Sequence, residues 1–266
     1  MAAGAVAGCL GAVLGIGGGV FLIPLLNVGL GLDLPIASGI SLMTVIATSS
    51  IVSAGSANRD VINLRLGILL QIPAVAGGLI GAETVDALSL RTLSLIFAVV
   101  TAVIAVVMLT RLDRRNVILD DTIDPGTLGG RYYEKESGRR IAYRLRRLPA
   151  ALGISFSGGI LSGLLGIGGG ILQVPALNAW CGVPMRAAAA TTAAMIGLTA
   201  LSSAPIYFSR GRILAPLAAA AVLGGLAGSR AGMRMSPHLR ARWLKLLMAA
   251  VLAMVSMIYF YKAATL

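Results

Sequence analysis

The chain has 266 residues, of which 57% are hydrophobic and 12% are charged, and its mean hydropathy is +0.90. A soluble domain carries about 25% charged residues, so this composition excludes an ordinary soluble protein. Apolar stretches of ~18 residues or more predict an all-α polytopic membrane protein. The formal net charge of +12 fits basic loops beside apolar spans better than nucleic-acid binding. Two cysteines, Cys9 and Cys181, are too few for a disulfide framework or a zinc site.

The first apolar segment, Ala2–Asn27, contains the sequence GIGGG at Gly15–Gly19, followed by Pro24 and Asn27. Glycine is about 1 kcal/mol less favourable than alanine in a helix, so we predict that this segment breaks at the glycines. Further spans are predicted over Pro35–Ala57, Leu64–Ala82 and Leu90–Leu109. The link Leu112–Pro149 holds 9 of the 22 Lys and Arg and 6 of the 10 Asp and Glu, which predicts an aqueous loop.

The second half of the chain repeats the first at an offset of 151 residues. The stretch LGIGGGVFLIPLLN corresponds to LGIGGGILQVPALN, and Ser41, Thr48, Arg59 and Gly81 correspond to Thr192, Thr199, Arg210 and Gly232. The constant offset indicates duplication and predicts spans over Ala150–Asn178, Pro184–Phe208, Ile213–Met233 and Trp243–Tyr261. We therefore predict a first transmembrane repeat at 1–111, a charged cytoplasmic loop at 112–149 and a second transmembrane repeat at 150–266.

The charge bias differs between the two halves. Arg59 and Arg65 lie between spans two and three of the first half, whereas Glu83 and Asp86 lie between spans three and four. In the second half the basic residues gather between spans three and four, at Arg230, Arg234, Arg240, Arg242 and Lys245. With the central loop inside, this pattern favours halves of opposite orientation, in which each broken segment enters and returns. The alternative is two parallel halves of four plain spans each.

A helix that breaks within lipid leaves backbone N–H and C=O groups without hydrogen-bond partners. Each such group costs several kcal/mol. Where the helix restarts, its first turn presents unbonded N–H groups and the positive end of the helix dipole, which together favour an anion. We therefore predict substrate-binding residues around both breaks: Gly17, Gly18, Gly19, Val20 and Asn27 in the first half, and Gly168, Gly169, Gly170, Ile171, Gln173 and Asn178 in the second. The alternative is that the glycines only allow close helix packing.

Hydroxyl side chains point to the same region. Ser41, Thr44 and Thr48 are spaced to share one helical face, and Thr192 and Thr199 belong to the equivalent span. Such groups donate to an oxyanion without adding charge, although they also serve as hydrogen-bonding links within and between helices. Gln173 replaces Leu22 of the first half, which predicts a site that is not fully symmetric. Arg59 and Arg210 are interpreted as an anion gate or as interfacial anchors.

No Asp, Glu, Lys or His lies in the middle of any predicted span. Paired carboxylates, a Ser-His pair and a metal-ligand cluster are also missing, so the sequence predicts no catalytic residues, no metal, no cofactor and no enzyme activity. The predicted partners are a small anionic substrate and the lipid bilayer, without nucleic acid. The sequence leaves homo-oligomerisation open.

The repeated stretches GAVLGIGGGVFLIPLLN and GLLGIGGGILQVPALN resemble the TauE/SafE family, also called the toluene-sulfonate uptake permeases. The resemblance covers nearly the whole chain, including the hydroxyl-bearing span after each break and the arginine that follows it. Gly17–Gly19 with Asn27, and Gly168–Gly170 with Asn178, match the motif of the family. The resemblance implies transport of sulfite, sulfonates or related organic acids across the cytoplasmic membrane.

The sequence analysis thus predicts an integral membrane transporter for a small sulfur-containing anion, working as an exporter with the anion held near the midplane. A carrier or a passive channel for another organic anion is the alternative within transport. A non-transporting membrane scaffold, whose charged central loop binds a partner, is the alternative from another class.

Overall fold

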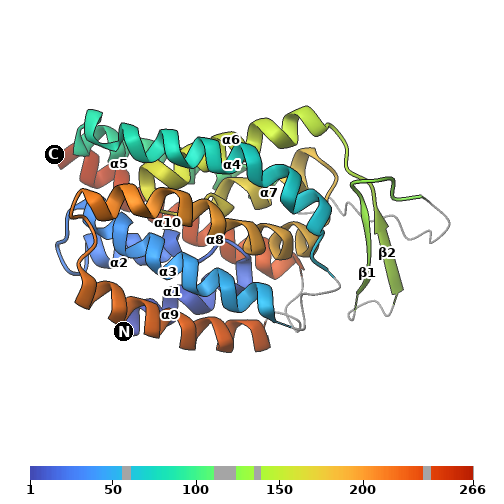
Figure 1. Cartoon of the computed structure of the whole chain (residues 1–266), viewed down its shortest axis with the longest axis horizontal. Coiled ribbons are helices and arrows are strands. Elements are labelled where there is room, and N and C mark those ends of the chain that lie inside the picture. The colour runs from blue at the N-terminus through green and yellow to red at the C-terminus, as the bar shows by residue number, and fades with distance from the viewer. Residues whose placement is uncertain (56–60, 111–123, 135–138, 236–240, 266) are drawn as a thin grey trace.

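The computed structural model describes residues 1–55, 61–110, 124–134, 139–235 and 241–265 (Figure 1). The first half forms α1 (Ala2–Leu14), α2 (Gly19–Asn27), α3 (Leu34–Ala54), α4 (Leu64–Thr84), the short 3-10 helix η2 (Val85–Ala87) and α5 (Leu90–Thr110). The second half forms α6 (Leu148–Leu165), α7 (Gly170–Trp180), α8 (Met185–Ser209), α9 (Ala215–Met235) and α10 (Ala241–Thr265). Two strands, β1 (Gly130–Glu134) and β2 (Arg139–Tyr143), lie between the halves.

The helices follow the predicted duplication closely. The starts of α2, α3, α4 and α5 each have a counterpart 151 residues later, at the starts of α7, α8, α9 and α10. Both apolar segments that contain GIGGG are broken there, α1 from α2 and α6 from α7. The glycine pattern therefore predicted the position of both breaks correctly.

The two halves interlock instead of lying side by side. Helix α1 packs along α9, and its counterpart α6 packs along α4, while α3 contacts α8 and α5 contacts α10. Exchanging the two halves turns the α1–α9 contact into the α6–α4 contact and leaves the α3–α8 and α5–α10 contacts unchanged. An approximate two-fold axis relating the halves gives this pattern. One hydrophobic cluster includes Leu14, Ile16, Ile40, Leu165 and Ile196, which come from both halves. The predicted boundaries at 1–111 and 150–266 therefore separate two sequence repeats that share one core. They stay a prediction.

Glycines allow the closest of these contacts. On α6, Gly159 faces the backbone of Ala74 in α4, and Gly163 faces that of Gly78. On α1, the corresponding Gly8 faces the backbone of Gly225 in α9. A side chain at these positions would overlap main-chain atoms that cannot rotate away, so small residues are needed for the helices to approach. Close packing therefore explains many glycines outside the two breaks.

The helices form an elongated body, with both termini at one end and the strands at the other (Figure 1). Among the described residues, five helices are long and apolar enough to cross a membrane: 34–54, 64–87, 90–107, 148–165 and 185–209. Large apolar side chains such as Ile68, Ile72 and Met257 are exposed on the surface of the body. These features support an all-α membrane protein. The layout of four spans per half stays a prediction.

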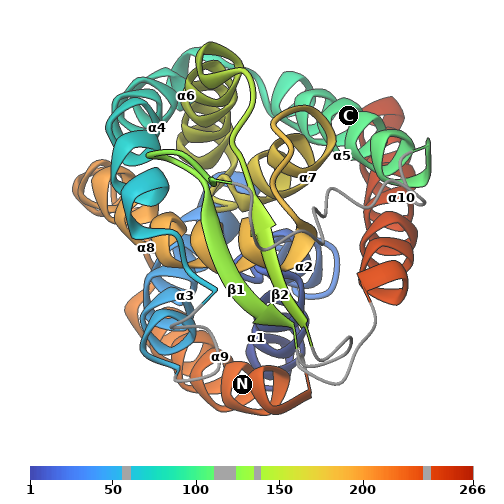
Figure 2. The same cartoon turned by 90° about the vertical axis from the view of Figure 1, so that its right-hand side faces the viewer.

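The predicted charged loop contains an antiparallel hairpin in which Tyr132 pairs with Ile141, an element that the all-α prediction lacks. Figure 2 shows the hairpin lying across the end of the helical body. Its base is fixed by the Asn63 amide, which donates to the carbonyl oxygens of Leu128 and Gly129 and to the Tyr143 hydroxyl. Burial raises the pKa of Tyr143, so this hydroxyl stays neutral. The apolar Ile141 and Tyr143 let the strands dock although the loop is highly charged.

Candidate functional site

The two helix breaks have the same backbone conformation. In the first break Gly15, Gly17 and Gly18 have φ angles of 72°, 80° and 78°. In the second, Gly166, Gly168 and Gly169 have φ angles of 71°, 81° and 75°. Residues with a Cβ are disfavoured in this left-handed region. Three of the four glycines in each GIGGG sequence are therefore required by the backbone itself.

Each break turns the chain back on itself. A Cβ at Gly18 would lie 2.5 Å from the carbonyl oxygen of Ala7, so α2 starts beside the middle of α1. A Cβ at Gly169 would lie 2.8 Å from the carbonyl oxygen of Gly158, at the same place in the second half. The Arg146 N–H donates to the Cys181 carbonyl at 2.9 Å, which brings the end of α7 back to the start of α6. The broken segments are therefore helical hairpins, α1–α2 and α6–α7.

The two glycine segments cross at the centre of the protein, in opposite directions. Gly19 lies against Gly166 and Ile167, and Gly170 lies against Gly15 and Ile16. A Cβ at Gly17 would lie 2.5 Å from Ile196 Cδ1 of α8, and one at Gly168 would lie 2.8 Å from Val45 Cγ1 of α3. Helices α3 and α8 thus enclose the crossing. Close approach explains the fourth glycine of each sequence, because Gly19 and Gly170 have ordinary φ angles.

The predicted hydroxyls of α3 bond to the backbone at the breaks. Ser41 Oγ donates to the Gly166 carbonyl at 2.7 Å, and Thr48 Oγ1 donates to the Gly17 carbonyl at 3.2 Å. Ser38 Oγ donates to the Leu165 carbonyl at 2.8 Å. Thr44 Oγ1 donates within its own helix, to the Ile40 carbonyl. The bonds of Ser38, Ser41 and Thr48 satisfy carbonyls that the broken helices leave without their usual partners.

The hydroxyls of α8 behave differently from their counterparts in α3. Thr192 Oγ1 is buried and has no hydrogen-bond partner among the described residues. Thr199 is buried and bonds to the Gln71 side chain of α4 at 3.1 Å. Val20 and Ile171, at the start of α2 and α7, are completely buried. The predicted residues next to the breaks are thus gathered at the centre and are closed off from the surface.

Asn27 and Asn178 lie away from the crossing. Asn27 is the last residue of α2, eight residues or about 12 Å beyond Gly19 along the helix axis. Its amide donates to the Leu32 carbonyl at 2.6 Å, and the Asn178 amide donates to the Val183 carbonyl at 2.9 Å. Lys262 Nζ also donates to Asn27 Oδ1, at 2.6 Å. Both asparagines therefore hold the turn that follows each hairpin, at opposite ends of the protein.

Gln173 is placed beside the second break. Both polar atoms of its side chain are buried and have no hydrogen-bond partner among the described residues. The same holds for the hydroxyls of Ser155 and Ser162 in α6. The sequence analysis did not select these two serines. Their signal in the sequence is a spacing of seven residues, which puts two hydroxyls on one face of an apolar helix.

Arg210 lies at the end of the body that holds the chain termini. Its guanidinium pairs with Glu83 at 2.5 Å and with Asp86 at 2.8 Å, and it donates to the Ala82 carbonyl. Arg212 also pairs with Asp86. These contacts join the α8–α9 turn to the end of α4. Arg59, the predicted counterpart of Arg210, lies outside the described residues.

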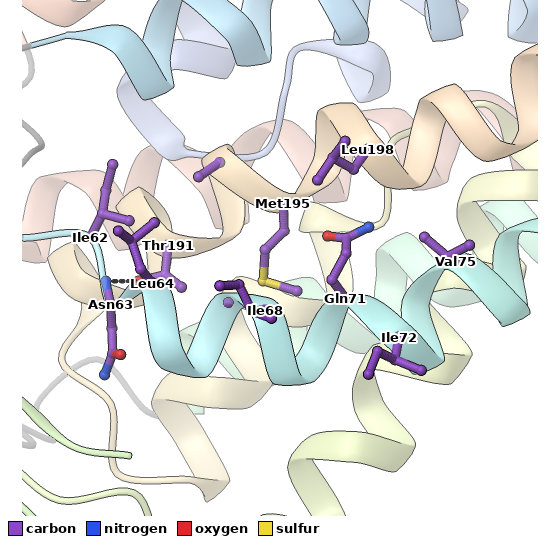
Figure 3. A pocket seen from close by; sticks show the side chains of 12 residues that line it. Ile62, Asn63, Leu64, Ile68, Gln71, Ile72, Val75, Thr191, Met195 and Leu198 are labelled. Atoms are coloured by element: carbon purple, nitrogen blue, oxygen red, sulfur yellow. Dashed lines mark hydrogen bonds between the residues drawn. The ribbon is translucent and has the colours of Figure 1, made fainter. Parts of the chain in front are cut away.

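A cavity of about 540 Å³ opens between α4 and α8, away from the glycine crossing. Figure 3 shows Gln71 pointing from α4 toward α8, beside Met195, while Ile68, Ile72 and Leu198 form apolar walls. Gln71 connects this cavity to the predicted site through its bond to Thr199. The sequence signal for Gln71 is a lone amide in an apolar span, where the second half has Val222.

An apolar bundle with two broken hairpins that meet at its centre has the architecture of a polytopic membrane transporter. The chain belongs to the TauE/SafE sulfite exporter family, because the family model described as "Sulfite exporter TauE/SafE" matches residues 1–259. A curated relative is the "Probable membrane transporter protein YunE" of Bacillus subtilis (strain 168), which is 24% identical over 259 residues. The alignment covers 95% of this chain and 93% of the relative. No solved structure matches the chain.

These comparisons confirm the family resemblance seen in the sequence. The members of this family are membrane transporters and not enzymes, and the chain is therefore a membrane-embedded, multi-pass transporter. A transporter acts on a small-molecule substrate from within a lipid bilayer. The scaffold alternative is thereby removed.

Proposed function

We propose that this transporter exports a small sulfur-containing anion, such as sulfite, a sulfonate or a related organosulfur acid, across the cytoplasmic membrane. The observation that carries the proposal is the crossing of the two glycine segments. There, the first turn of α2 begins at Gly19 against Gly166 and Ile167, and the first turn of α7 begins at Gly170 against Gly15 and Ile16, inside a buried shell. Helix N-termini favour an anion through their free N–H groups and their dipole.

The crossing also explains how an anion is bound without a buried cation. Ser41 and Thr192 stand on α3 and α8 beside the breaks. The Thr192 hydroxyl is a neutral donor without a partner among the described residues, whereas the Ser41 hydroxyl has to leave the Gly166 carbonyl before it can donate to an anion. The glycines leave the backbone accessible to an approaching oxygen atom. We propose a binding region made of Gly17–Gly19, Gly168–Gly170, the first turns that start with Val20 and Ile171, and the side chains of Ser41, Thr48, Thr192, Thr199 and Gln173. Asn27 and Asn178 support it by fixing the turns.

We propose that the two halves are inverted in the membrane. The α1–α2 hairpin starts at the end that holds the termini, whereas the α6–α7 hairpin starts at the end that holds the strands (Figure 1). Six helices, α3 to α5 and α8 to α10, then cross the bilayer, and the two hairpins enter and return. The strands belong to the basic central loop, which the positive-inside rule places in the cytoplasm. The ion pairs of Arg210 would face the opposite side.

The buried site implies that transport requires movement. All of the proposed binding residues are closed off from both ends, so the described conformation is occluded. Two different structures cover the ends: the β-hairpin lies across one, and the Arg210 pairs with Glu83 and Asp86 join the helices at the other. Alternating access would open one of them at a time.

Export of an anion is favoured by the membrane potential. An inside-negative potential drives a negative charge outward by about 2.3 kcal/mol per 100 mV. The proposed site contains no Asp or Glu, so no proton carrier is built into it. We expect outward flux to need neither sodium nor a pH gradient.

Proteoliposomes that contain the purified protein test this function. They are loaded with radiolabelled sulfite, thiosulfate or benzenesulfonate, and efflux is measured with potassium and valinomycin setting the potential. We expect at least one of these anions to leave faster than from protein-free vesicles, and to leave faster still when the interior is made negative. Transport of only non-sulfur organic anions would support the alternative carrier. Flux that depends linearly on concentration without saturation would support the channel.

A further inference from the structure

The second hairpin contains three polar side chains that the protein does not use internally. Ser155 and Ser162 lie on α6, and Gln173 lies on α7, and each is almost completely buried. Among the described residues, the two serine hydroxyls have no hydrogen-bond partner, and the same is true of the oxygen and the nitrogen of the Gln173 amide. A buried polar group without a partner destabilises a fold, because nothing replaces the water that it loses. Four such atoms in one hairpin indicate a site for something that the protein binds.

These side chains line the contact between the two helices. Ser155, Gly158 and Ser162 are three and four residues apart and share the face of α6 that meets α7. A Cβ at Gly158 would lie 3.2 Å from Gln173 Cγ and 3.5 Å from Gln173 Nε2, so the amide lies opposite Gly158. A Cβ at Gly169 would lie 3.7 Å from Ser162 Cβ. The cluster is therefore next to the first turn of α7, at the glycine crossing.

The first half does not have this cluster. The positions equivalent to Ser155, Ser162 and Gln173 are Gly4, Gly11 and Leu22, which carry no polar side-chain atom. The backbone of the α1–α2 hairpin is nevertheless the same, as the matching φ angles show. The two hairpins therefore share their geometry but differ in chemistry.

We propose that Ser162 and Gln173 form the head-group subsite of the transported anion, with the first turn of α7, and that Ser155, two helical turns along α6, lines the same helix contact beyond the head group. This inference rests on the proposed function and deepens it: the transporter binds one oxyanion per chain, in the second half, in spite of its repeated architecture. The Ser162 hydroxyl and the Gln173 amide provide separate donors for two oxygen atoms of a sulfite or sulfonate group. The positive end of the α7 dipole favours the negative charge.

The variant Gln173→Leu tests this subsite, because it introduces the residue that the first half has at the equivalent position. Binding of sulfite, thiosulfate and benzenesulfonate to the purified full-length protein is measured by calorimetry, with N-methylglucamine as the only cation. Hydrogen bonds to a charged group contribute about 1.5–3 kcal/mol, so we expect affinity to fall by about tenfold or more. The unfolding temperature without anion should stay the same or rise, since two unpartnered polar atoms are removed. Ser162→Ala should act in the same direction on both measurements.

Ser229→Ala is the matched control. Ser229 is also a buried serine of an apolar helix, but its hydroxyl already donates to the Gly225 carbonyl of α9. We expect this variant to bind anions like the unaltered protein. The subsite proposal is overturned if Gln173→Leu and Ser162→Ala raise stability and leave anion affinity unchanged. A second result would also overturn it. If sodium chloride raises the unfolding temperature of the unaltered protein more than N-methylglucamine chloride does, and these variants lose that difference, the cluster holds a cation and not an anion. If the unaltered protein binds none of the anions, the proposed function fails together with the subsite.

Discussion

The α1–α2 and α6–α7 hairpins have the same backbone and different side chains. Both break at glycines whose φ angles agree within a few degrees, and both return beside their own first helix. Around the second break, however, Ser38 and Ser41 of α3 bond the carbonyls of Leu165 and Gly166. The equivalent positions in α8 are Ala189, which has no hydroxyl, and Thr192, whose hydroxyl has no partner among the described residues.

This difference shows which features of a duplicated protein are constrained by the fold. The left-handed glycines cannot change in either half, because the hairpins need them. The polar side chains within the two hairpins differ while the φ angles agree, so the hairpin conformation does not depend on those side chains. The functional chemistry is therefore best sought where equivalent positions differ, as at Gln173 and Leu22, instead of where they agree.

The largest expected effect concerns the direction of the two hairpins. Cysteines introduced by Asp86→Cys and Arg234→Cys, in a chain with Cys9→Ala and Cys181→Ala, should react with a membrane-impermeant maleimide from opposite sides. The reason is that α4 ends beside Arg210, at the end of the body that holds the termini, whereas α9 ends where the strands lie. The measurement compares labelling of intact cells with labelling of inverted vesicles. Labelling of both cysteines from one side would exclude inverted halves and favour the parallel arrangement.

The second prediction tests whether the two breaks depend equally on their left-handed glycines. Gly18→Ala and Gly169→Ala should each lower stability by about 1–2 kcal/mol from the left-handed backbone alone. The clash with a main-chain oxygen adds to this, more at Gly18 than at Gly169, because the distances are 2.5 and 2.8 Å. Thermal unfolding of the purified variants measures the effect.

Gly153→Ala is the control for these variants, because no atom lies within 4 Å of the Cβ position at Gly153 in α6. It should leave the unfolding temperature unchanged or raise it slightly, since alanine favours a helix. Equal stability of Gly18→Ala and the unaltered protein would mean that the first break does not need its left-handed glycines.

The third prediction compares the equivalent hydroxyls of α3 and α8. Ser41→Ala should destabilise the protein by about 1–3 kcal/mol, because it leaves the buried Gly166 carbonyl without this donor. Thr192→Val keeps the shape and removes a hydroxyl that has no partner among the described residues, so it should be neutral or stabilising. Chemical or thermal unfolding of both variants separates the two cases. An equal loss of stability in both would show that Thr192 has a structural bond in the folded state.

The sequence predicted the breaks, the offset and the helices well, because glycine runs and long apolar stretches have local physical causes. It did not predict which polar groups satisfy one another. Ser41 was selected as a donor to substrate, and its hydroxyl is found on the Gly166 carbonyl, 125 positions away in the chain. Ser155 and Ser162 were missed because nothing local distinguishes a serine without a partner from one that bonds its own helix, as Ser229 does. The β-hairpin was missed because its docking depends on Asn63, far away in the chain.

The smallest expected effect concerns Glu83, the least implausible proton carrier in the sequence because it directly follows an apolar span. Glu83 is largely exposed and pairs with Arg210, and an exposed ion pair contributes only about 0–1 kcal/mol. Asp86 pairs with the same guanidinium, so Arg210 keeps a partner when Glu83 is neutralised. We therefore expect Glu83→Gln to change outward anion flux from proteoliposomes less than twofold, at equal pH on both sides and with a pH gradient. A flux that requires the gradient in the unaltered protein and loses that requirement in Glu83→Gln would instead make Glu83 a coupling residue. The end joined by ion pairs would then take part in energy conversion, and the asymmetry between the halves would extend beyond the α6–α7 hairpin.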